Sequence, residues 1–246
     1  MAETVRLTRT APTTLGMSQV TLLRIAIILG VLSSWELLAR SGWLYRDVVP
    51  SLTTLGAALF DLLSGREYYF HLGVTAAEIG VALAIGGISG MIVGLVFGAN
   101  RFLAVAFERY LYYLGPTPKI IFFPIMIMWF GIGPGSKIAL GTLSCFFPVA
   151  LSVAAGMRQI DLPDHLPAMR HPVINGFRLG LGIALIGTLL AETKLSNKGI
   201  GFLIINAYST FDMPRMYANL IILFVIAIGA NALVGRIGGL DSIKLK

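Results

Sequence analysis

Charged residues are scarce in this chain of 246 amino acids. Asp, Glu, Lys and Arg make up 13% of it, whereas hydrophobic residues make up 56%, and the mean hydropathy is +0.82. A soluble domain usually has about 25% charged residues, so a water-soluble globular protein is excluded. The excess of 19 Lys and Arg over 12 Asp and Glu lies among apolar runs rather than on a soluble basic face, so we expect no nucleic-acid partner.

Cysteine and the familiar catalytic motifs are almost absent as well. Cys145 is the single cysteine, which excludes an intrachain disulfide. The run Gly135-Ser136-Lys137 does not fit the phosphate-binding loop, which places four residues between two glycines before its Lys. The three histidines lack the spacing of metal ligands; they are His71, His165 and His171. We therefore expect no enzyme activity, no catalytic residue, no cofactor and no metal site.

Long apolar runs are what the sequence has instead. A helix that crosses a bilayer needs about 20 apolar residues, and six segments qualify. They are residues 22–39, 72–98, 105–130, 138–157, 173–191 and 216–235. The sequence thus predicts an all-α polytopic membrane protein with six transmembrane helices. Its single membrane domain covers residues 22–235, between tails over residues 1–21 and 236–246. The 13 residues of 199–211 are too few to span and predict an interfacial or re-entrant piece.

The basic residues favour one orientation of these spans. With both termini in the cytoplasm, twelve of the 19 Lys and Arg lie on or near the cytoplasmic side, as the positive-inside rule expects. Those twelve are Arg6, Arg9, Arg24, Arg101, Arg109, Lys119, Arg158, Arg170, Arg178, Arg236, Lys244 and Lys246.

The second span carries a row of small residues. Gly86, Gly90, Gly94 and Gly98 recur every four residues, so one helical face lacks side chains and another backbone can approach it closely. We expect a helix-packing face here, with a ligand-lining face as the alternative. Glu78 lies near the outer end of the same span, where it either lines a polar path or extends to the interface.

The third span contains helix breakers around a charge. Pro116, Pro118 and Pro124 each remove an amide donor and clash with the preceding turn, so this helix is expected to be broken or kinked near Lys119. Interrupted helices form the substrate path in many transporters. These four residues are therefore candidates for a translocation path or gate, and a static kink is the alternative.

Several motifs, in a fixed order, resemble one family of membrane proteins. They are Tyr113–Lys119 (YLGPTPK), Pro124–Gly133 (PIMIMWFGIG), Ser136–Ile138 (SKI), Phe146–Pro148 (FFP), Gly176–Gly182 (GFRLGLG), Ala191–Glu192 (AE) and Gly199–Ile204 (GIGFLI). The chain resembles the permease subunit of a binding-protein-dependent ABC importer of the nitrate, sulfonate and taurine type. The resemblance covers nearly the whole chain after Leu22.

The resemblance implies a fold, a function and partners. The fold is that of an ABC type I importer permease in the bacterial inner membrane. A second copy would complete a homodimer around the path of a small solute, such as an oxyanion, a sulfonate or a cofactor precursor. Two cytoplasmic ATPase subunits would drive transport, and an extracytoplasmic solute-binding protein would deliver the solute.

One cytoplasmic loop, residues 158–172, departs from the family pattern. Such permeases carry there a Glu-Ala-Ala motif on a short helix that seats in the ATPase. Asp161 corresponds to the acid that precedes the motif, and Leu166-Pro167 corresponds to its closing pair. The candidates for the ATPase-facing loop are therefore Asp161, Asp164, Leu166 and Pro167. Because Pro163, Pro167 and Pro172 oppose helix formation, we expect no coupling helix and weak coupling to the ATPase. The alternative function is an uncoupled membrane scaffold that keeps the permease fold.

The orientation of the termini is testable by labelling. We predict that single cysteines placed by Ser18→Cys and Ser242→Cys, each with Cys145 replaced, are cytoplasmic and are not labelled by a membrane-impermeant thiol reagent in intact cells. Both should label after the cells are opened. Labelling of either position in intact cells would contradict the six-span topology.

Overall fold

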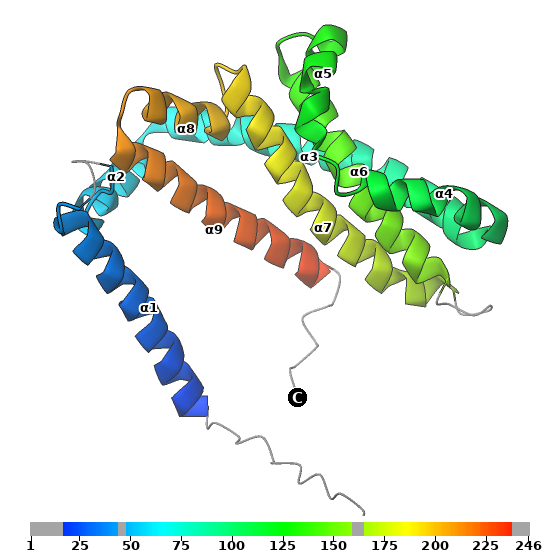
Figure 1. Cartoon of the computed structure of the whole chain (residues 1–246), viewed down its shortest axis with the longest axis horizontal. Coiled ribbons are helices and arrows are strands. Elements are labelled where there is room, and N and C mark those ends of the chain that lie inside the picture. Colours follow the sequence, from blue (N-terminus) through cyan, green and yellow to red (C-terminus); the bar gives the residue numbers. More distant parts are fainter. Residues whose placement is uncertain (1–16, 44–47, 159–164, 238–246) are drawn as a thin grey trace, which may run out of the picture. The chain divides into compact units, whose positions relative to one another are not determined.

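The chain is mainly helical within the residues that its computed structural model describes, 17–43, 48–158 and 165–237. Those ranges contain no β-strand, and the expected all-α class is confirmed. In chain order the elements are α1 (Met17–Arg40), α2 (Leu52–Ser64), α3 (Arg66–Ala99), α4 (Arg101–Leu114), the 3₁₀ helix η1 (Lys119–Phe122), α5 (Phe123–Phe130), α6 (Pro134–Arg158), α7 (His165–Lys194), α8 (Ile200–Ser209) and α9 (Met213–Ile237) (Figure 1).

Five of these helices are long and apolar enough to cross a membrane: α1, α3, α6, α7 and α9. They correspond to five of the six expected spans. The sixth, residues 105–130, is not one continuous helix, because α4 ends at Leu114 and η1 begins at Lys119. The prolines between them explain the break, since each lacks the amide hydrogen that a continuing helix needs.

The chain divides into two compact units, residues 1–53 and 54–246. In the first unit, Glu36 on α1 makes hydrogen bonds to the end of α1 and to the start of α2. Its carboxylate accepts a hydrogen bond from the amide of Leu52 at 2.8 Å and one from Nε of Arg40 at 2.6 Å. The amide of Leu52 lies in the first turn of a helix and has no intrahelical partner. Glu36 therefore satisfies a polar group of the backbone where the helix begins.

Helices α3, α6 and α7 pack together at the centre of the second unit (Figure 1). The glycine row of α3, Gly86, Gly90, Gly94 and Gly98, faces α6. A Cβ atom at Gly90 would lie 2.7 Å from the carbonyl oxygen of Phe146, and one at Gly94 would lie 2.6 Å from that of Ala150. Equivalent atoms at Gly86 and Gly98 would meet Thr142 and Met157. The backbones of α3 and α6 thus approach at a distance that only glycine permits.

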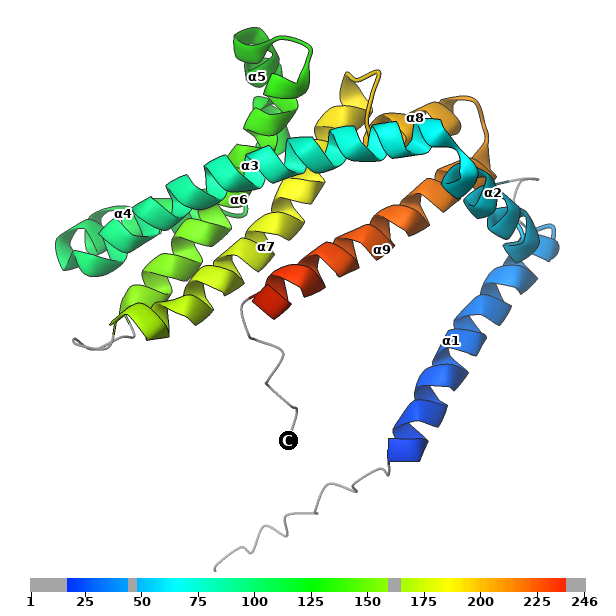
Figure 2. The same ribbon diagram turned by 180° about the vertical axis from the view of Figure 1, so that it is seen from behind.

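The interrupted segment lies against the same centre. Leu111 of α4 packs on Phe147 and Ala150 of α6, and Phe123, where α5 begins, packs on Leu140 of α6 and on α7. Figure 2, the reverse view, shows α4 beside α3 and the short α5 standing apart at the other end of the segment. The break therefore lies between two pieces that are both anchored on α6.

Three elements differ from the sequence-based expectation. Helix α2 was not foreseen, because its 13 residues fall short of a membrane span. Residues 199–211 do contain a short helix, α8. The expectation that Pro167 and Pro172 oppose a helix was wrong, since both lie within α7. Pro167 is in the first turn, where amide hydrogens have no intrahelical partner, so its missing donor removes no helical hydrogen bond.

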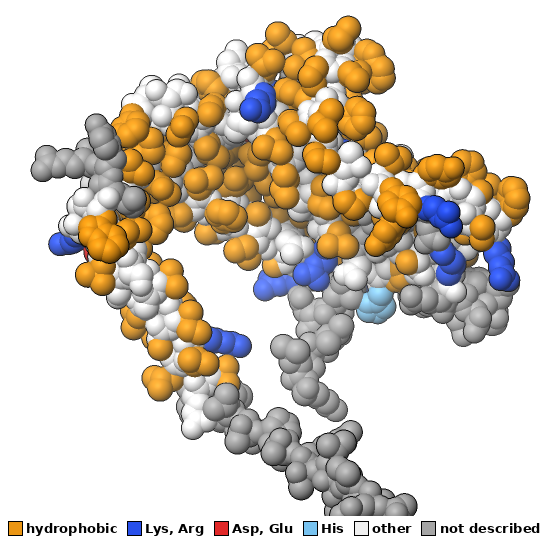
Figure 3. All heavy atoms as spheres, viewed as in Figure 1, with side chains coloured by type: hydrophobic (Ala, Val, Ile, Leu, Met, Phe, Trp, Pro, Cys, Tyr) orange, Lys and Arg blue, Asp and Glu red, His pale blue; other side chains and the backbone are white. Residues whose placement is uncertain are grey.

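The surface of the second unit is largely apolar. Figure 3 shows hydrophobic side chains over most of the visible face, and most of its Lys and Arg side chains lie by α4 and at the end of α9. Large apolar side chains such as Ile85, Phe224 and Ile228 are more than half exposed. Such a surface suits lipid or a partner chain and not water.

Two glycines of α3 give a matched test of the packing face. A methyl group at Gly94 would clash with α6, whereas one at Gly80 on the same helix meets nothing within 4 Å. We predict that Gly94→Ala destabilises the protein by about 1–3 kcal/mol through overpacking. Gly80→Ala should be neutral or stabilising by about 0.5–1 kcal/mol, because alanine favours a helix. Melting temperatures in detergent measure both, and equal values would contradict a close α3–α6 contact.

Candidate functional site

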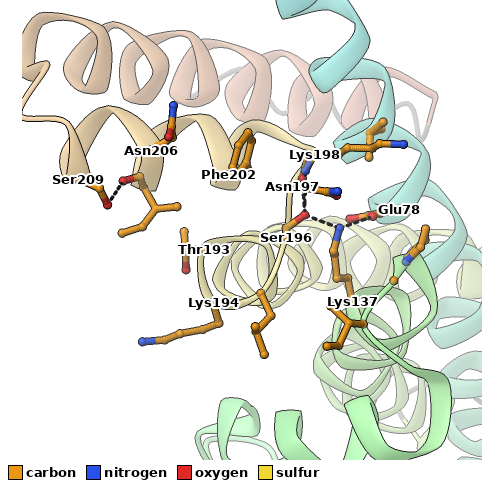
Figure 4. Close-up of a pocket in the computed structure, with 16 residues that line it drawn as sticks. Glu78, Lys137, Thr193, Lys194, Ser196, Asn197, Lys198, Phe202, Asn206 and Ser209 are labelled. Carbon is orange, nitrogen blue, oxygen red and sulfur yellow. Dashed lines mark hydrogen bonds and ion pairs between the residues drawn. The ribbon is translucent and has the colours of Figure 1, made fainter.

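A pocket of about 650 Å³ opens between α3, the start of α6 and the connection from α7 to α8 (Figure 4). We call it the lysine pocket, because Lys137, Lys194 and Lys198 line it. Glu78 is the single acidic residue among its described lining residues. Its other polar lining residues are Thr193, Ser196, Asn197, Asn206 and Ser209. The pocket therefore carries more positive than negative charge.

A buried ion pair closes the inner end of this pocket. Nζ of Lys137 on α6 lies 3.0 Å from Oε1 of Glu78 on α3, and the two side chains are only 5% and 3% exposed. The same ammonium donates a hydrogen bond to Oγ of Ser196 at 2.7 Å. Charges so far from water persist only when they are paired and hydrogen-bonded. Glu78 therefore joins α3 to α6 here, and Ser196 extends the contact to the α7–α8 connection.

A second buried carboxylate holds the start of α8. Oε1 of Glu192 accepts a hydrogen bond from Oγ1 of Thr75 at 2.6 Å, and Oε2 accepts one from the amide of Gly201 at 2.6 Å. Thr75 in turn accepts a hydrogen bond from the amide of Ile200 at 2.8 Å. The first amides of a helix have no intrahelical acceptor. Side chains of α7 and α3 supply these acceptors and hold α8 in place.

Gly199 makes this arrangement possible. Its φ angle is +100°, a conformation that favours glycine, and a Cβ atom here would collide with the carboxylate of Glu192. Its amide donates to Nδ1 of His71 at 3.0 Å, and the His71 ring stacks on Phe202 of α8. The wall of the lysine pocket formed by the α7–α8 connection is thus fixed to α3 at several points.

The residues proposed for a path or gate lie elsewhere. Pro116 and Pro118 fall in the break between α4 and η1, and Pro124 is in the first turn of α5. Lys119 is half-buried at the start of η1. Its ammonium donates to the carbonyl oxygen of Gly115 and lies 5.1 Å from the ring centre of Phe147. None of these residues lines the lysine pocket.

The residues proposed to face an ATPase are only partly described. Asp161 and Asp164 lie outside the described residues, and Leu166 and Pro167 fall in the first turn of α7. The proposed packing residues Gly86, Gly90, Gly94 and Gly98 meet α6 as described above.

Sequence reasoning missed the partners within the site. Lys137 and Glu192 were assigned only to family motifs, Ser136–Ile138 and Ala191–Glu192. The sequence did contain a signal in the positions of these residues, since Glu78 and Lys137 lie near the outer ends of the second and fourth expected spans and carry opposite charges.

Comparison with known proteins points to one family. Residues 164–238 match the family described as "Binding-protein-dependent transport system inner membrane component". The chain is 26% identical to the putative aliphatic sulfonates transport permease protein SsuC of Bacillus subtilis, across 80% of this chain and 78% of that protein. It is 28% identical to SsuC of Escherichia coli, across 90% and 89%. The taurine transport system permease protein TauC of Escherichia coli is 28% identical, across 68% and 69%.

These matches confirm the resemblance to permease subunits of binding-protein-dependent ABC importers of the sulfonate, taurine and nitrate type. They support a permease role in a multi-pass protein of the bacterial inner membrane, with an ATPase and a solute-binding protein as partners. The uncoupled scaffold finds no support in them.

The buried ion pair can be tested with a double-mutant cycle. We predict that Glu78→Gln alone or Lys137→Gln alone destabilises the protein by about 3–5 kcal/mol, because each leaves one buried charge unpaired. The double variant should recover much of that loss. As a control, Arg40→Gln breaks the exposed pair with Glu36 and should cost about 0–1 kcal/mol. Additive effects of the two buried changes on thermal stability would mean that the pair is not formed.

Proposed function

We propose that this chain, as an importer permease, forms the membrane path for a small solute of the oxyanion, sulfonate or cofactor-precursor kind, driven by separate ATPase subunits. The interrupted segment 101–130 carries the proposal. Backbone that is not helical at membrane depth is tolerated where protein or a water-filled cavity covers it, because lipid satisfies none of its polar groups. The chain around Pro116 and Pro118, between the end of α4 and the start of η1, is non-helical backbone of this kind.

Lys119 supports an anionic or polar solute. A lysine within a membrane segment is costly and usually faces a polar path. The ammonium of Lys119 has a carbonyl oxygen and an aromatic ring as its described partners, and no carboxylate within ion-pair distance among the described residues. Its positive charge therefore remains available to a passing anion.

A second copy of the chain would enclose this path. The outer faces of α4 and α5 bear large, well-exposed side chains, including Phe102 at 78% and Met128 at 84% exposed. One copy leaves Lys119 half-exposed beside this apolar surface. Pairing two such surfaces would remove Lys119 from lipid and place two cations along one path, which supports a homodimer.

The two ends of the unit would meet different partners. With both termini in the cytoplasm, residues 158–172, which run from the end of α6 into the first turns of α7, would face the ATPase. The lysine pocket then lies at the opposite end of α6 and α7, on the side where the solute-binding protein docks. The loop 158–172 lacks the family's coupling motif, so we expect weak ATPase binding.

Uptake by reconstituted vesicles tests the function and the loop together. We predict little ATP-driven uptake by the unmodified chain with its cognate ATPase and binding protein. Insertion of about 15–20 family-like residues between Asp161 and Pro167, enough for a helix of about two turns with its flanks, should restore ATPase binding and uptake. Pull-down measures ATPase binding, and uptake of a radiolabelled sulfonate, inorganic oxyanion or cofactor precursor, each assayed separately, measures transport.

An insertion of the same length rich in Gly and Ser is the control, because it adds chain without a rigid helix. Robust uptake by the unmodified chain would refute the weak coupling and leave the permease role standing. If the restored chain binds the ATPase and still moves no solute of the three proposed kinds, the permease proposal fails.

A further inference from the structure

We propose that the lysine pocket is a binding site of the permease itself for the oxyanion group of an organic solute such as a sulfonate or carboxylate. Lys194 and Lys198 make the outer contacts, and Lys137 lies at the inner end. The identity of the ligand as the transported solute rests on the proposed function. The site lies apart from the interrupted segment and would be the first position that the solute occupies.

The charge balance of the pocket selects an anion. Glu78 is its one described acidic residue, and its charge is matched by Lys137 at 3.0 Å. Neither Lys194 nor Lys198 has a carboxylate within ion-pair distance among the described residues, and the ammonium of Lys198 lies over the ring of Phe70 at 5.6 Å. Two positive charges are therefore left without a counter-ion at the mouth of one cavity, which attracts anions.

The ion pair between Lys137 and Glu78 does not use all of the hydrogen-bonding capacity of the two side chains. An ammonium group has three donors, and Lys137 uses one for Glu78 and one for Ser196. Oε2 of Glu78 is buried and has no hydrogen-bond partner in the described part of the chain, and the buried carboxyl group of Glu192 lies near enough to interact with Glu78. Buried polar groups nearly always find partners, so this position calls for a further polar group. An oxyanion would accept the third N–H of Lys137, and an amine or a water molecule would donate to Glu78.

The remaining lining suits a ligand with a polar head and an apolar tail. Hydroxyl and amide groups of Thr193, Asn197 and Asn206 can donate to several oxygens of one head group. Ile132 and Phe202 line the same cavity and offer apolar contact. The volume of about 650 Å³ lies within the usual range of small-molecule pockets, about 300–1,000 Å³. An organic sulfonate combines these two features, whereas inorganic sulfate has only the first.

Direct binding to the full chain in phosphatidylcholine nanodiscs tests the site without ATPase or binding protein. The probe is radiolabelled ethanesulfonate in equilibrium dialysis, with inorganic sulfate as a competitor. We expect Lys194→Gln and Lys198→Gln each to weaken binding about fivefold to tenfold, as loss of a charge-assisted contact does. Lys194→Arg should keep most of the affinity. Arg66→Gln removes an exposed charge outside the pocket and should change nothing.

The source of the oxyanion is distinguished by the lipid. If the headgroup of an anionic lipid fills the pocket, nanodiscs that contain phosphatidylglycerol will abolish ethanesulfonate binding, and this overturns the solute assignment. Equal binding by the wild type and both Gln variants overturns the site itself. If ATP-driven uptake occurs but ethanesulfonate binding does not depend on Lys194 or Lys198, the proposed site is refuted and the permease function still stands. Lysine-dependent binding without uptake in the restored chain supports the site and refutes the function.

Discussion

The ion pair between Glu78 and Lys137 is the interaction on which the rest of this structure depends. It joins α3 to α6 where both side chains are almost completely buried, and Ser196 adds the α7–α8 connection to the same ammonium. A charge of either sign alone would be strongly disfavoured there, so each residue requires the other. The relative position of three segments distant in sequence is thereby set at one point.

Two kinds of contact hold α3 in place: close backbone packing near its C-terminal end and polar contacts near its N-terminal end. The glycines from Gly86 to Gly98 bring the backbone of α3 against α6, and Thr75 and His71 hold the start of α8. In a membrane, helices gain little from burying apolar surface against each other, so backbone approach and interhelical hydrogen bonds provide the stability. The site sits at the polar end, where its geometry is most constrained.

Much of the fold could be predicted because its causes are local. Apolar length gives the long helices, and Pro116 and Pro118 give the break before Lys119. The site could not be predicted in the same way, because Glu78 and Lys137 are 59 positions apart and only the packing of α3 on α6 brings them together. Position within a helix also mattered: Pro167 reads as a helix breaker, yet it lies in a first turn where no donor is needed.

Two kinds of lysine suit two steps of transport on this proposal. Lys137 is paired with the carboxylate of Glu78 when no solute is bound. An arriving anion therefore shares the ammonium of Lys137 with Glu78 and does not become its sole counter-ion. Lys119 has a backbone carbonyl and an aromatic ring as its described partners, both weaker than a carboxylate. A path must bind its solute well enough to admit it and weakly enough to release it. A first site at the outer end and Lys119 of each copy further in meet both demands, because Lys137 of the first site stays paired with Glu78 and each copy supplies one Lys119 to the path.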